Sequence, residues 1–422
     1  MLSKEILRQI VIQQKNDKFP IDETVERDVL NELLRWFTDN RILILTGLRR
    51  SGKSTILRQI IQKMPKYCYV NFEDERFIDF KAQEFEQLNE VLIEVYNNPT
   101  TYFFDEIQNI NKFETFVRRL QDQGKKVVIT GSNASLLSKE LGTRLTGRYK
   151  SFEIYPFSFN EYLKFYKVRP DKEWFYLTEK KVQLIQLFEK YLAIGGMPEY
   201  IKNKDMDYIR TIYENILYRD VIVRYLIKKQ KLLKELVNIL MTNISSLFTY
   251  NSLKKTLGLS NAITVKEYIS YLHNSYLFFE LQKFDFSIKK QLNAPKKIFV
   301  IDPVFHQLCG LNFSLNKGKI LENIVFIELR RNRKEVYYYS NKNECDFLIK
   351  DGTKIIEAIQ VCYLLDDTNK ERELNGLLEA MKTFHLKKGL LLTQDQDEEI
   401  IENGKKIEVL PVWKWILRNS FS

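Results

Sequence analysis

Long hydrophobic runs are missing from this sequence of 422 residues. No apolar run approaches the roughly 18–20 consecutive residues that a membrane-spanning helix needs. The first residues, MLSKEILRQIVIQQKNDK, contain neither the apolar segment of a signal peptide nor a small-residue cleavage site, so we expect no export signal. These absences favour a cytoplasmic protein with no membrane partner.

Cysteine, proline and glycine are also scarce. The four cysteines, Cys68, Cys309, Cys345 and Cys362, are scattered and form no CxxC pair, which favours buried thiols over a zinc site or a disulfide framework. Only 9 prolines and 15 glycines occur, and 44% of the residues are hydrophobic, so we expect an ordered globular chain. Its length favours roughly two to four domains.

Positive charge is in excess and is unevenly distributed. The 66 lysines and arginines exceed the 55 acidic residues, for a net charge of +11. Between Arg224 and Val300, 13 Lys and Arg residues stand against 4 Asp and Glu residues. This concentration indicates either a polyanion-binding face or an ordinary basic surface, and charge alone does not separate the two.

One loop has the composition of a polyphosphate site. Residues 47–54, GLRRSGKS, fit the pattern G-x-x-x-x-G-K-[ST], between a strand-like apolar run and a helix-like run. In such a loop the backbone N–H groups and the helix N-terminus face the phosphates, the lysine reaches the β- and γ-phosphates, and the next hydroxyl ligates Mg²⁺. We predict an ATP site made of Gly47, Leu48, Arg49, Arg50, Ser51, Gly52, Lys53, Ser54 and Thr55, with Ser54 as a metal ligand.

Two adjacent acids end a second apolar segment, TTYFFDEIQN. We predict that Asp105 holds Mg²⁺ through water and that Glu106 polarises the attacking water. A further strand-like segment, KYCYVNFEDE, lies between this pair and the loop. The combination indicates the branch of P-loop NTPases that carries its own hydrolytic base.

Polar residues after the next strand-like segments extend the predicted site. The run KKVVITG is followed by Ser132 and Asn133. Asn133 is the first candidate to position the lytic water and Ser132 the second, although Asn133 could also cap the following helix. Arg148 is the preferred candidate for an arginine finger that acts in a neighbouring subunit, Arg144 is the other, and a plain surface arginine is the alternative.

Taken in order, these motifs resemble those of a widespread group of prokaryotic AAA+ ATPases, over essentially the whole chain. The resemblance also rests on LTGRYKSFEIYPFSFNEYL, YLAIGGMPEY and LYRDVIVRY. It implies an α/β P-loop AAA+ core with a parallel sheet and a helical lid, then a winged helix and a small α/β nuclease-like domain. We place these parts at residues 1–157, 158–225, 226–312 and 313–422.

Local patterns agree with this division. Ser158 and Glu161 have the spacing of a capping box at the start of the lid, in which Arg219 and Arg224 are sensor-2 candidates or plain surface arginines. Residues 231–303 have the order helix, turn, helix and basic hairpin, which is typical of a winged helix. If the winged helix binds DNA, the contacts would come from Lys266, Lys289, Lys290, Lys296 and Lys297; the alternative is a protein–protein spacer.

The last hundred residues follow the order helix, three strands, helix and strand, similar to the PD-(D/E)xK nuclease core. Glu322 and Asp346 match its helical and strand acids. Strand alternation, however, puts Gln360 and Cys362 where an E-x-K pair is expected, and it puts Glu357 on the other face unless a β-bulge intervenes. We therefore expect a degenerate domain in which nuclease activity is lost.

Together these patterns favour a Mg²⁺-dependent AAA+ ATP hydrolase that uses ATP and forms a ring or partial ring. Hydrolysis would be coupled to binding, remodelling or translocation of duplex or branched DNA. Two alternatives stay open: a nucleotide-gated regulatory or signalling switch that assembles protein partners, and an ATP-driven DNA nuclease.

Overall fold

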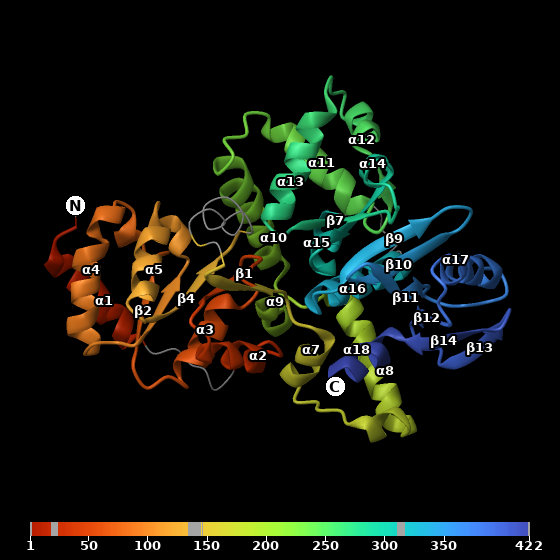
Figure 1. Cartoon of the computed structure of the whole chain (residues 1–422), viewed down its shortest axis with the longest axis horizontal. Coiled ribbons are helices and arrows are strands. Elements are labelled where there is room, and N and C mark those ends of the chain that lie inside the picture. The colour runs from red at the N-terminus through yellow and green to blue at the C-terminus, as the bar shows by residue number, and fades with distance from the viewer. Residues whose placement is uncertain (1, 18–23, 134–144, 146, 310–316, 421–422) are drawn as a thin grey trace. The chain divides into compact units, whose positions relative to one another are not determined.

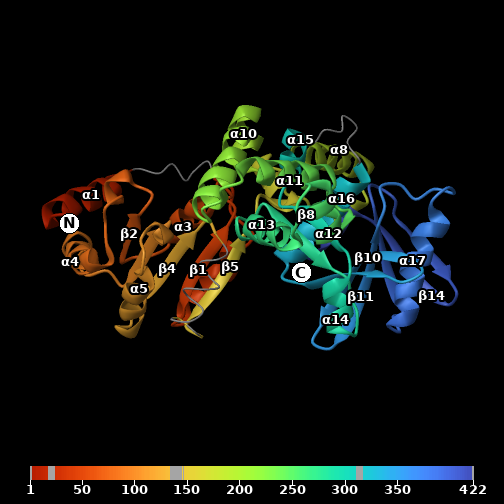
Figure 2. The same ribbon diagram turned by 90° about the horizontal axis from the view of Figure 1, so that it is seen from above.

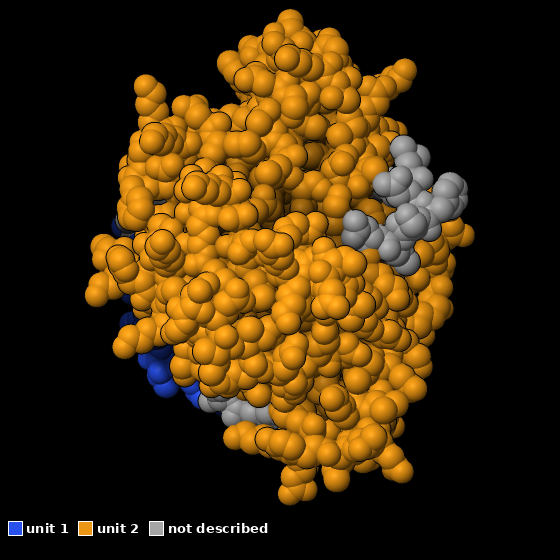
Figure 3. Space-filling model, turned by 90° about the vertical axis from the view of Figure 1, so that its right-hand side faces the viewer, with its two compact units in different colours: residues 1–155, 274–276 blue, residues 156–273, 277–422 orange. Residues whose placement is uncertain are grey.

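The computed structural model describes residues 2–17, 24–133, 145, 147–309 and 317–420 (Figure 1). These residues divide into two compact units. Unit 1 contains residues 1–155 together with 274–276, and unit 2 contains residues 156–273 and 277–422 (Figure 3). The short segment Asn274–Tyr276 thus belongs to the first unit, although it lies far from it in sequence.

Unit 1 is built on a five-stranded parallel sheet with the order β2-β3-β4-β1-β5, whose strands run side by side in Figure 2. Each face is covered by its own apolar cluster, so the strands are near-continuous hydrophobic runs, as expected for a parallel sheet between helices. The elements are α1 (Lys4–Asn16), α2 (Leu30–Arg35), β1 (Ile42–Gly47), α3 (Lys53–Ile61), β2 (Tyr67–Asn71), α4 (Phe85–Tyr96), β3 (Thr101–Asp105), α5 (Phe113–Asp122), β4 (Lys126–Gly131) and β5 (Tyr149–Ile154).

Unit 2 begins with a helical segment. The predicted capping box is present, because the Ser158 hydroxyl accepts a hydrogen bond from the Glu161 N–H at 3.1 Å and the Glu161 carboxylate accepts one from the Ser158 N–H at 2.9 Å. The segment contains α7 (Phe159–Phe165), α8 (Thr178–Ile194), α9 (Pro198–Asn203), α10 (Met206–Asn215) and a π-helical stretch (Ile216–Val223).

The basic region of unit 2 combines helices with a three-stranded antiparallel sheet of order β6-β8-β7. The two strands expected as a hairpin are present, but a short helix, α14, lies between them. The elements are α11 (Gln230–Thr242), β6 (Leu247–Phe248), α12 (Tyr250–Thr256), α13 (Ala262–Asn274), β7 (Phe278–Gln282), α14 (Ile288–Asn293), β8 (Lys296–Val300) and α15 (Pro303–Cys309).

The C-terminal part of unit 2 has a six-stranded mixed sheet of order β13-β14-β12-β11-β10-β9. It begins with α16 (Lys317–Arg331), whose residues from Ile320 to Leu329 are all buried. The other elements are β9 (Glu335–Ser340), β10 (Glu344–Asp351), β11 (Lys354–Val361), α17 (Lys370–Thr383), β12 (Lys388–Thr393), β13 (Glu398–Glu402), β14 (Lys405–Pro411) and α18 (Val412–Ser420).

Candidate nucleotide site

The predicted phosphate-binding loop connects β1 to α3. Gly47 has a φ of +145°, and a Cβ placed there would lie 2.1 Å from the carbonyl oxygen of Ile154, so only glycine fits. Gly52 caps α3 with a φ of +101°. The two glycines thus allow the turn that brings the loop backbone to the helix N-terminus, the position that favours an anion.

The side chain of Lys53 lies inside this loop and is 4% exposed. Its ammonium donates to the carbonyl oxygens of Gly47 at 3.1 Å and Leu48 at 3.0 Å. Its nitrogen also lies 3.8 Å from a carboxylate oxygen of Glu106. Lys53 is therefore held at the point where the loop and the end of β3 meet.

The other loop residues differ in exposure. Ser51 is buried, whereas Arg50 is exposed and has a φ of +65°. Arg49 forms an ion pair with Glu73 at 2.9 Å. The arginines of the loop therefore lie toward its surface, and its backbone and Lys53 form the interior.

Asp105 and Glu106 end β3, next to β4. Both carboxylates are buried, and Thr130 of β4 connects them, because its hydroxyl donates to Asp105 and accepts a hydrogen bond from the Glu106 N–H at 2.9 Å. The Tyr69 hydroxyl donates to the second oxygen of Asp105 at 3.1 Å. This edge of the sheet therefore holds both acids in fixed orientations.

The two acids differ electrostatically. Burial and the neighbouring Glu106 charge raise the pKa of the Asp105 carboxyl above its usual value. Burial also opposes ionisation of Glu106, but the Lys53 ammonium and a hydrogen bond from Gln108 outweigh it and lower the pKa of the Glu106 carboxyl. Glu106 is therefore kept as a carboxylate, the form that a general base needs.

The oxygen atoms of Ser54 and Asp105 suit Mg²⁺. The Ser54 hydroxyl lies close enough to the Asp105 carboxyl to lower its pKa, so a hydroxyl and a carboxylate lie together beside the loop. Mg²⁺ in nucleotide sites is held by few protein oxygens together with phosphates and water. The residues present thus fit the predicted metal.

The remaining predicted residues lie outside the phosphate-binding loop, after β4 and near the start of β5. Ser132 and Asn133 are buried directly after β4, and the Ser132 hydroxyl contributes to the lowered pKa of Glu106. Arg148 pairs with Asp122 near the start of β5. Arg144 lies outside the described residues.

The sensor-2 candidates lie in unit 2. Arg224 forms a 3.8 Å ion pair with Asp220, one turn earlier in the chain. Arg219 belongs to the π-helical stretch before it. The ion pair with Asp220 favours the interpretation of Arg224 as a surface arginine over that of a sensor-2 residue.

Sequence reasoning missed three residues that support the nucleotide site. Arg27 is 4% exposed and donates to the carbonyl oxygens of Ser51 at 2.8 Å and Tyr155 at 2.7 Å, which fixes the loop. Thr130 was missed, although it stands in the strand-like run KKVVITG. The Tyr276 hydroxyl donates to the hydroxyl of Thr46 at 2.7 Å, so the 274–276 segment contacts the residue before the loop. No sequence signal could have found Arg27 or Tyr276, because their partners are distant in the chain.

Two of the lysines assigned to DNA are buried, and that prediction is wrong. Lys296 is 7% exposed and donates to the carbonyl oxygens of Leu292 at 3.2 Å and Ala294 at 3.4 Å. Lys297 is 2% exposed and forms ion pairs with three carboxylates. Lys297 can be buried because carboxylates of α16 and β10 neutralise it, and the sequence of the hairpin alone does not reveal these partners.

The predicted nuclease-like acids lie in the group around Lys297. Glu322 of α16 and Asp346 of β10 both contact this lysine. Gln360 accepts a hydrogen bond from the Asp346 N–H at 3.3 Å and donates to Glu373 of α17 at 2.6 Å. Cys362 packs in the apolar cluster that includes Leu374 and Leu377.

Comparison with family models divides the chain into three matched segments. Residues 39–163 match the model described as an AAA domain. Residues 185–312 and 317–415 match two domains of unknown function, DUF8612 and DUF4143. Among the described residues, no helix is both long and apolar enough to cross a membrane.

Two curated proteins are similar to the chain over most of its length. Uncharacterized protein MJ1544 of Methanocaldococcus jannaschii is 36% identical over 438 residues, covering 99% of this chain and 96% of the relative. An uncharacterized protein of Haemophilus influenzae is 29% identical over 406 residues, covering 92% of this chain and 97% of the relative.

Two solved structures are similar to part of the chain. The Walker-type ATPase of Pyrococcus abyssi has a TM-score of 0.46 and 14% identity, over 68% of this chain and 96% of that chain. The Orc1 protein of Aeropyrum pernix, solved in complex with DNA, has a TM-score of 0.31 and 13% identity, over 71% of this chain and 94% of that chain.

Proposed function

Because the chain belongs to the same family as Uncharacterized protein MJ1544 of Methanocaldococcus jannaschii and carries an AAA domain, we propose that it is a Mg²⁺-dependent ATP hydrolase. The observation that carries the proposal is the buried set of Lys53, Asp105 and Glu106 at one edge of the parallel sheet. A carboxylate kept ionised beside a phosphate-binding loop suits hydrolysis better than binding alone.

Each of these side chains has a proposed role. The loop backbone and Lys53 bind the β- and γ-phosphates, so the ammonium exchanges the carbonyl oxygens of Gly47 and Leu48 for phosphate oxygens. Ser54 and Asp105 hold Mg²⁺, which supplies charge neutralisation on the phosphates. Glu106 accepts the proton of the attacking water, and Asn133 or Ser132 positions that water.

The rigid setting of Glu106 supports its role as the base. Its backbone adopts a φ of +51°, and its N–H is bonded to Thr130 at 2.9 Å. A non-glycine residue in the left-handed region is held there by its surroundings and is common at active sites. The carboxylate is therefore aimed by the backbone as well as by its side-chain contacts.

The first test compares two variants. Lys53→Ala should abolish ATP binding, whereas Glu106→Gln should bind ATP normally and lose turnover by about 10²-fold or more. ATP binding is measured by calorimetry and turnover by phosphate release. Lys63→Ala and Glu75→Gln, exposed positions in the same unit, are the matched controls. Wild-type turnover in Glu106→Gln would remove this glutamate from the mechanism.

We further propose that hydrolysis is coupled to DNA. The support is the exposure of lysines on three helices of the basic region of unit 2, namely Lys255 of α12, Lys266 of α13 and Lys289 and Lys290 of α14. Helices with clustered lysines are typical of faces that contact phosphates. The proposed winged helix would supply this face, and the C-terminal domain would add binding without cleavage.

The coupling is tested by measuring ATP turnover with no DNA, with duplex DNA and with a four-way junction. Stimulation by either DNA supports the coupling, and a larger effect of the junction would indicate recognition of branched DNA. Equal turnover in all three conditions would contradict it and favour the nucleotide-gated switch that assembles protein partners.

A further inference from the structure

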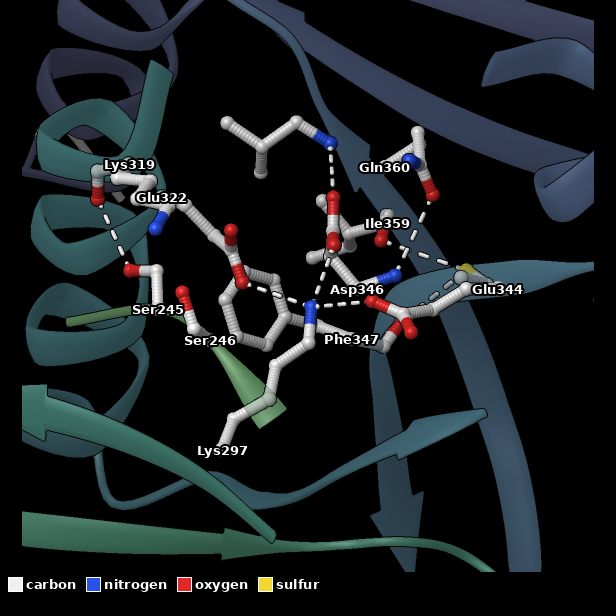
Figure 4. A network of polar contacts seen from close by, with 12 residues as sticks. Ser245, Ser246, Lys297, Lys319, Glu322, Glu344, Asp346, Phe347, Ile359 and Gln360 are labelled. Atoms are coloured by element: carbon white, nitrogen blue, oxygen red, sulfur yellow. Dashed lines mark hydrogen bonds and ion pairs between the residues drawn. The ribbon is translucent and has the colours of Figure 1, made fainter. Parts of the chain in front are cut away.

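The ammonium of Lys297 lies at the centre of three carboxylates (Figure 4). Its nitrogen is 2.9 Å from Glu322 Oε1, 2.8 Å from Glu344 Oε1 and 2.8 Å from Asp346 Oδ1. The lysine comes from β8, the first glutamate from α16, and the other two acids from β10. Three parts of unit 2 that are separate in sequence thus meet at one cation.

The carboxylates are positioned by their own elements. The pairing of β10 with β9 shifts register between Cys345 and Leu348, and such a bulge re-aims the side chain beside it. The second oxygen of Asp346 accepts the Val361 N–H of β11 at 2.9 Å. Glu322 lies in the fully buried stretch of α16. Asp346 is therefore held in place by a contact other than the one with the lysine.

Burial and mutual attraction shift the pKa values of Lys297 and Glu322. Burial opposes the charge on Lys297, but Asp346, Glu322 and Glu344 outweigh it and raise the pKa of the ammonium well above its usual value. Burial, only partly offset by Lys297, raises the pKa of Glu322 to about 8. Three carboxyl groups thus share one ammonium, and burial keeps a proton on Glu322 up to about pH 8.

We propose that Lys297 takes the place of a divalent cation in a three-carboxylate site of the C-terminal domain. An ammonium has three N–H donors, of which one donates to Glu322 and one to Asp346, while Glu344 forms an ion pair with the same nitrogen. Carboxylate oxygens grouped around one point are the ligands that hard divalent cations use. The lysine excludes such an ion from the native chain, and removal of its charge creates a binding site for one.

The distances also predict which ion the vacated position prefers. Oxygens that lie 2.8–2.9 Å from the lysine nitrogen need a small contraction to reach Ca²⁺, which binds oxygen at roughly 2.3–2.6 Å. Mg²⁺ requires about 2.0–2.1 Å and near-octahedral geometry. Ca²⁺ should therefore bind the variant more tightly than Mg²⁺.

The experiment uses the full-length chain without nucleotide. Ca²⁺ and Mg²⁺ are titrated by calorimetry into the wild type, Lys297→Met, Lys297→Arg and the double variant Lys297→Met/Asp346→Asn. We expect one additional Ca²⁺ site in Lys297→Met that is absent from the other three. Folding is followed in the same samples, and Ca²⁺ should raise the Tm of Lys297→Met by several degrees, because a ligand of the folded state stabilises it.

Loss of the lysine leaves three carboxylates facing one another, so Lys297→Met could fail to fold without added ion. The variant Lys297→Met/Glu344→Gln has one carboxylate fewer and tests the same site, with weaker Ca²⁺ binding expected. The proposal is overturned if both Met variants bind no additional Ca²⁺. Two results with the wild type would also overturn it. One is divalent-ion binding that Asp346→Asn abolishes, and the other is incision of DNA with Mg²⁺ or Mn²⁺ that Asp346→Asn abolishes.

Discussion

Thr130 makes the two acids of the nucleotide site depend on one hydroxyl. Its Oγ1 atom donates to Asp105 and accepts the Glu106 N–H at 2.9 Å. The sequence motif identified the acids because their spacing is local. It passed over Thr130, because only the parallel pairing of β3 with β4 brings this residue to them. Sequence reasoning therefore identified the two acids and missed the hydroxyl that holds them in position.

Replacement of Thr130 by Val should impair catalysis more than ATP affinity. The variant keeps the side-chain shape but leaves the Glu106 N–H without its partner, a loss that costs about 1–3 kcal/mol of folding free energy. Chemical unfolding and steady-state kinetics measure both effects. The matched control is Thr101→Val, at the opposite end of β3, where turnover should be unchanged. Normal kcat in Thr130→Val would show that the hydroxyl does not orient Glu106.

Asp302 is a buried acid in unit 2 with two backbone donors. It accepts the Gly196 N–H at 2.7 Å and the Val304 N–H at 3.0 Å. Burial raises the pKa of its carboxyl to about 7, although both N–H groups and Arg331 oppose the shift. Between about pH 4 and pH 7 the folded chain thus binds a proton that the unfolded chain has lost, and stability falls as the pH rises through that window.

Asp302→Asn should remove this pH dependence. Relative to the variant, the free energy of unfolding of the wild type should decrease by about 2 kcal/mol between pH 5 and pH 7.5. Urea unfolding at several pH values measures the difference. Asp351→Asn, at an exposed position, should follow the wild type. Parallel pH curves for the wild type and Asp302→Asn would contradict the assignment.

At the scale of elements, helix α14 determines which lysines of the predicted basic hairpin are exposed. The sequence predicted the strands β7 and β8 and their charge, but it treated all four lysines as exposed, because charged residues usually are. Lys289 and Lys290 on α14 are exposed, whereas Lys296 and Lys297 on β8 are buried. The difference could not be predicted, because the partners of Lys297 lie in α16 and β10.

If the predicted hairpin binds DNA, Lys289 and Lys290 of α14 should therefore make the contacts with phosphates. Reversal of Lys289 and Lys290 to Glu should weaken duplex binding and flatten the slope of log K against log salt by about 0.9 for each phosphate that the helix no longer neutralises. Fluorescence anisotropy at several salt concentrations measures both changes. Reversal of Lys172 and Lys202, two exposed lysines in the helical segment, is the matched control. Equal effects of the two double variants would indicate only nonspecific charge attraction.

At the scale of the whole molecule, Arg148 is the residue that the sequence predicted to act between subunits. Its backbone is fixed, since its carbonyl oxygen accepts the Ile42 N–H at 2.9 Å, while its guanidinium pairs with Asp122 and is 39% exposed. We propose that this surface arginine acts in the nucleotide site of a second copy of the chain. The sequence motif predicted the position, whereas the role itself depends on a residue pairing with a neighbouring chain.

Mixing two inactive variants tests this role. Arg148→Ala should bind ATP but hydrolyse it slowly, and addition of Lys53→Ala protein should partly restore turnover, because each variant supplies what the other lacks. Asp122→Ala is the control for the intrachain ion pair and should remain active. Turnover that is independent of protein concentration, with no complementation, would contradict the finger assignment.

The membership of residues 274–276 in unit 1 has a consequence for synthesis of the chain. The Tyr276 hydroxyl bonds Thr46, and both residues are buried. N-terminal domains generally fold while the remainder is still being made. Here the N-terminal unit lacks one of its own segments until more than a hundred further residues have been translated. Thr46, the residue before the phosphate-binding loop, therefore receives this hydrogen bond only after the helical segment and the first part of the basic region have been translated.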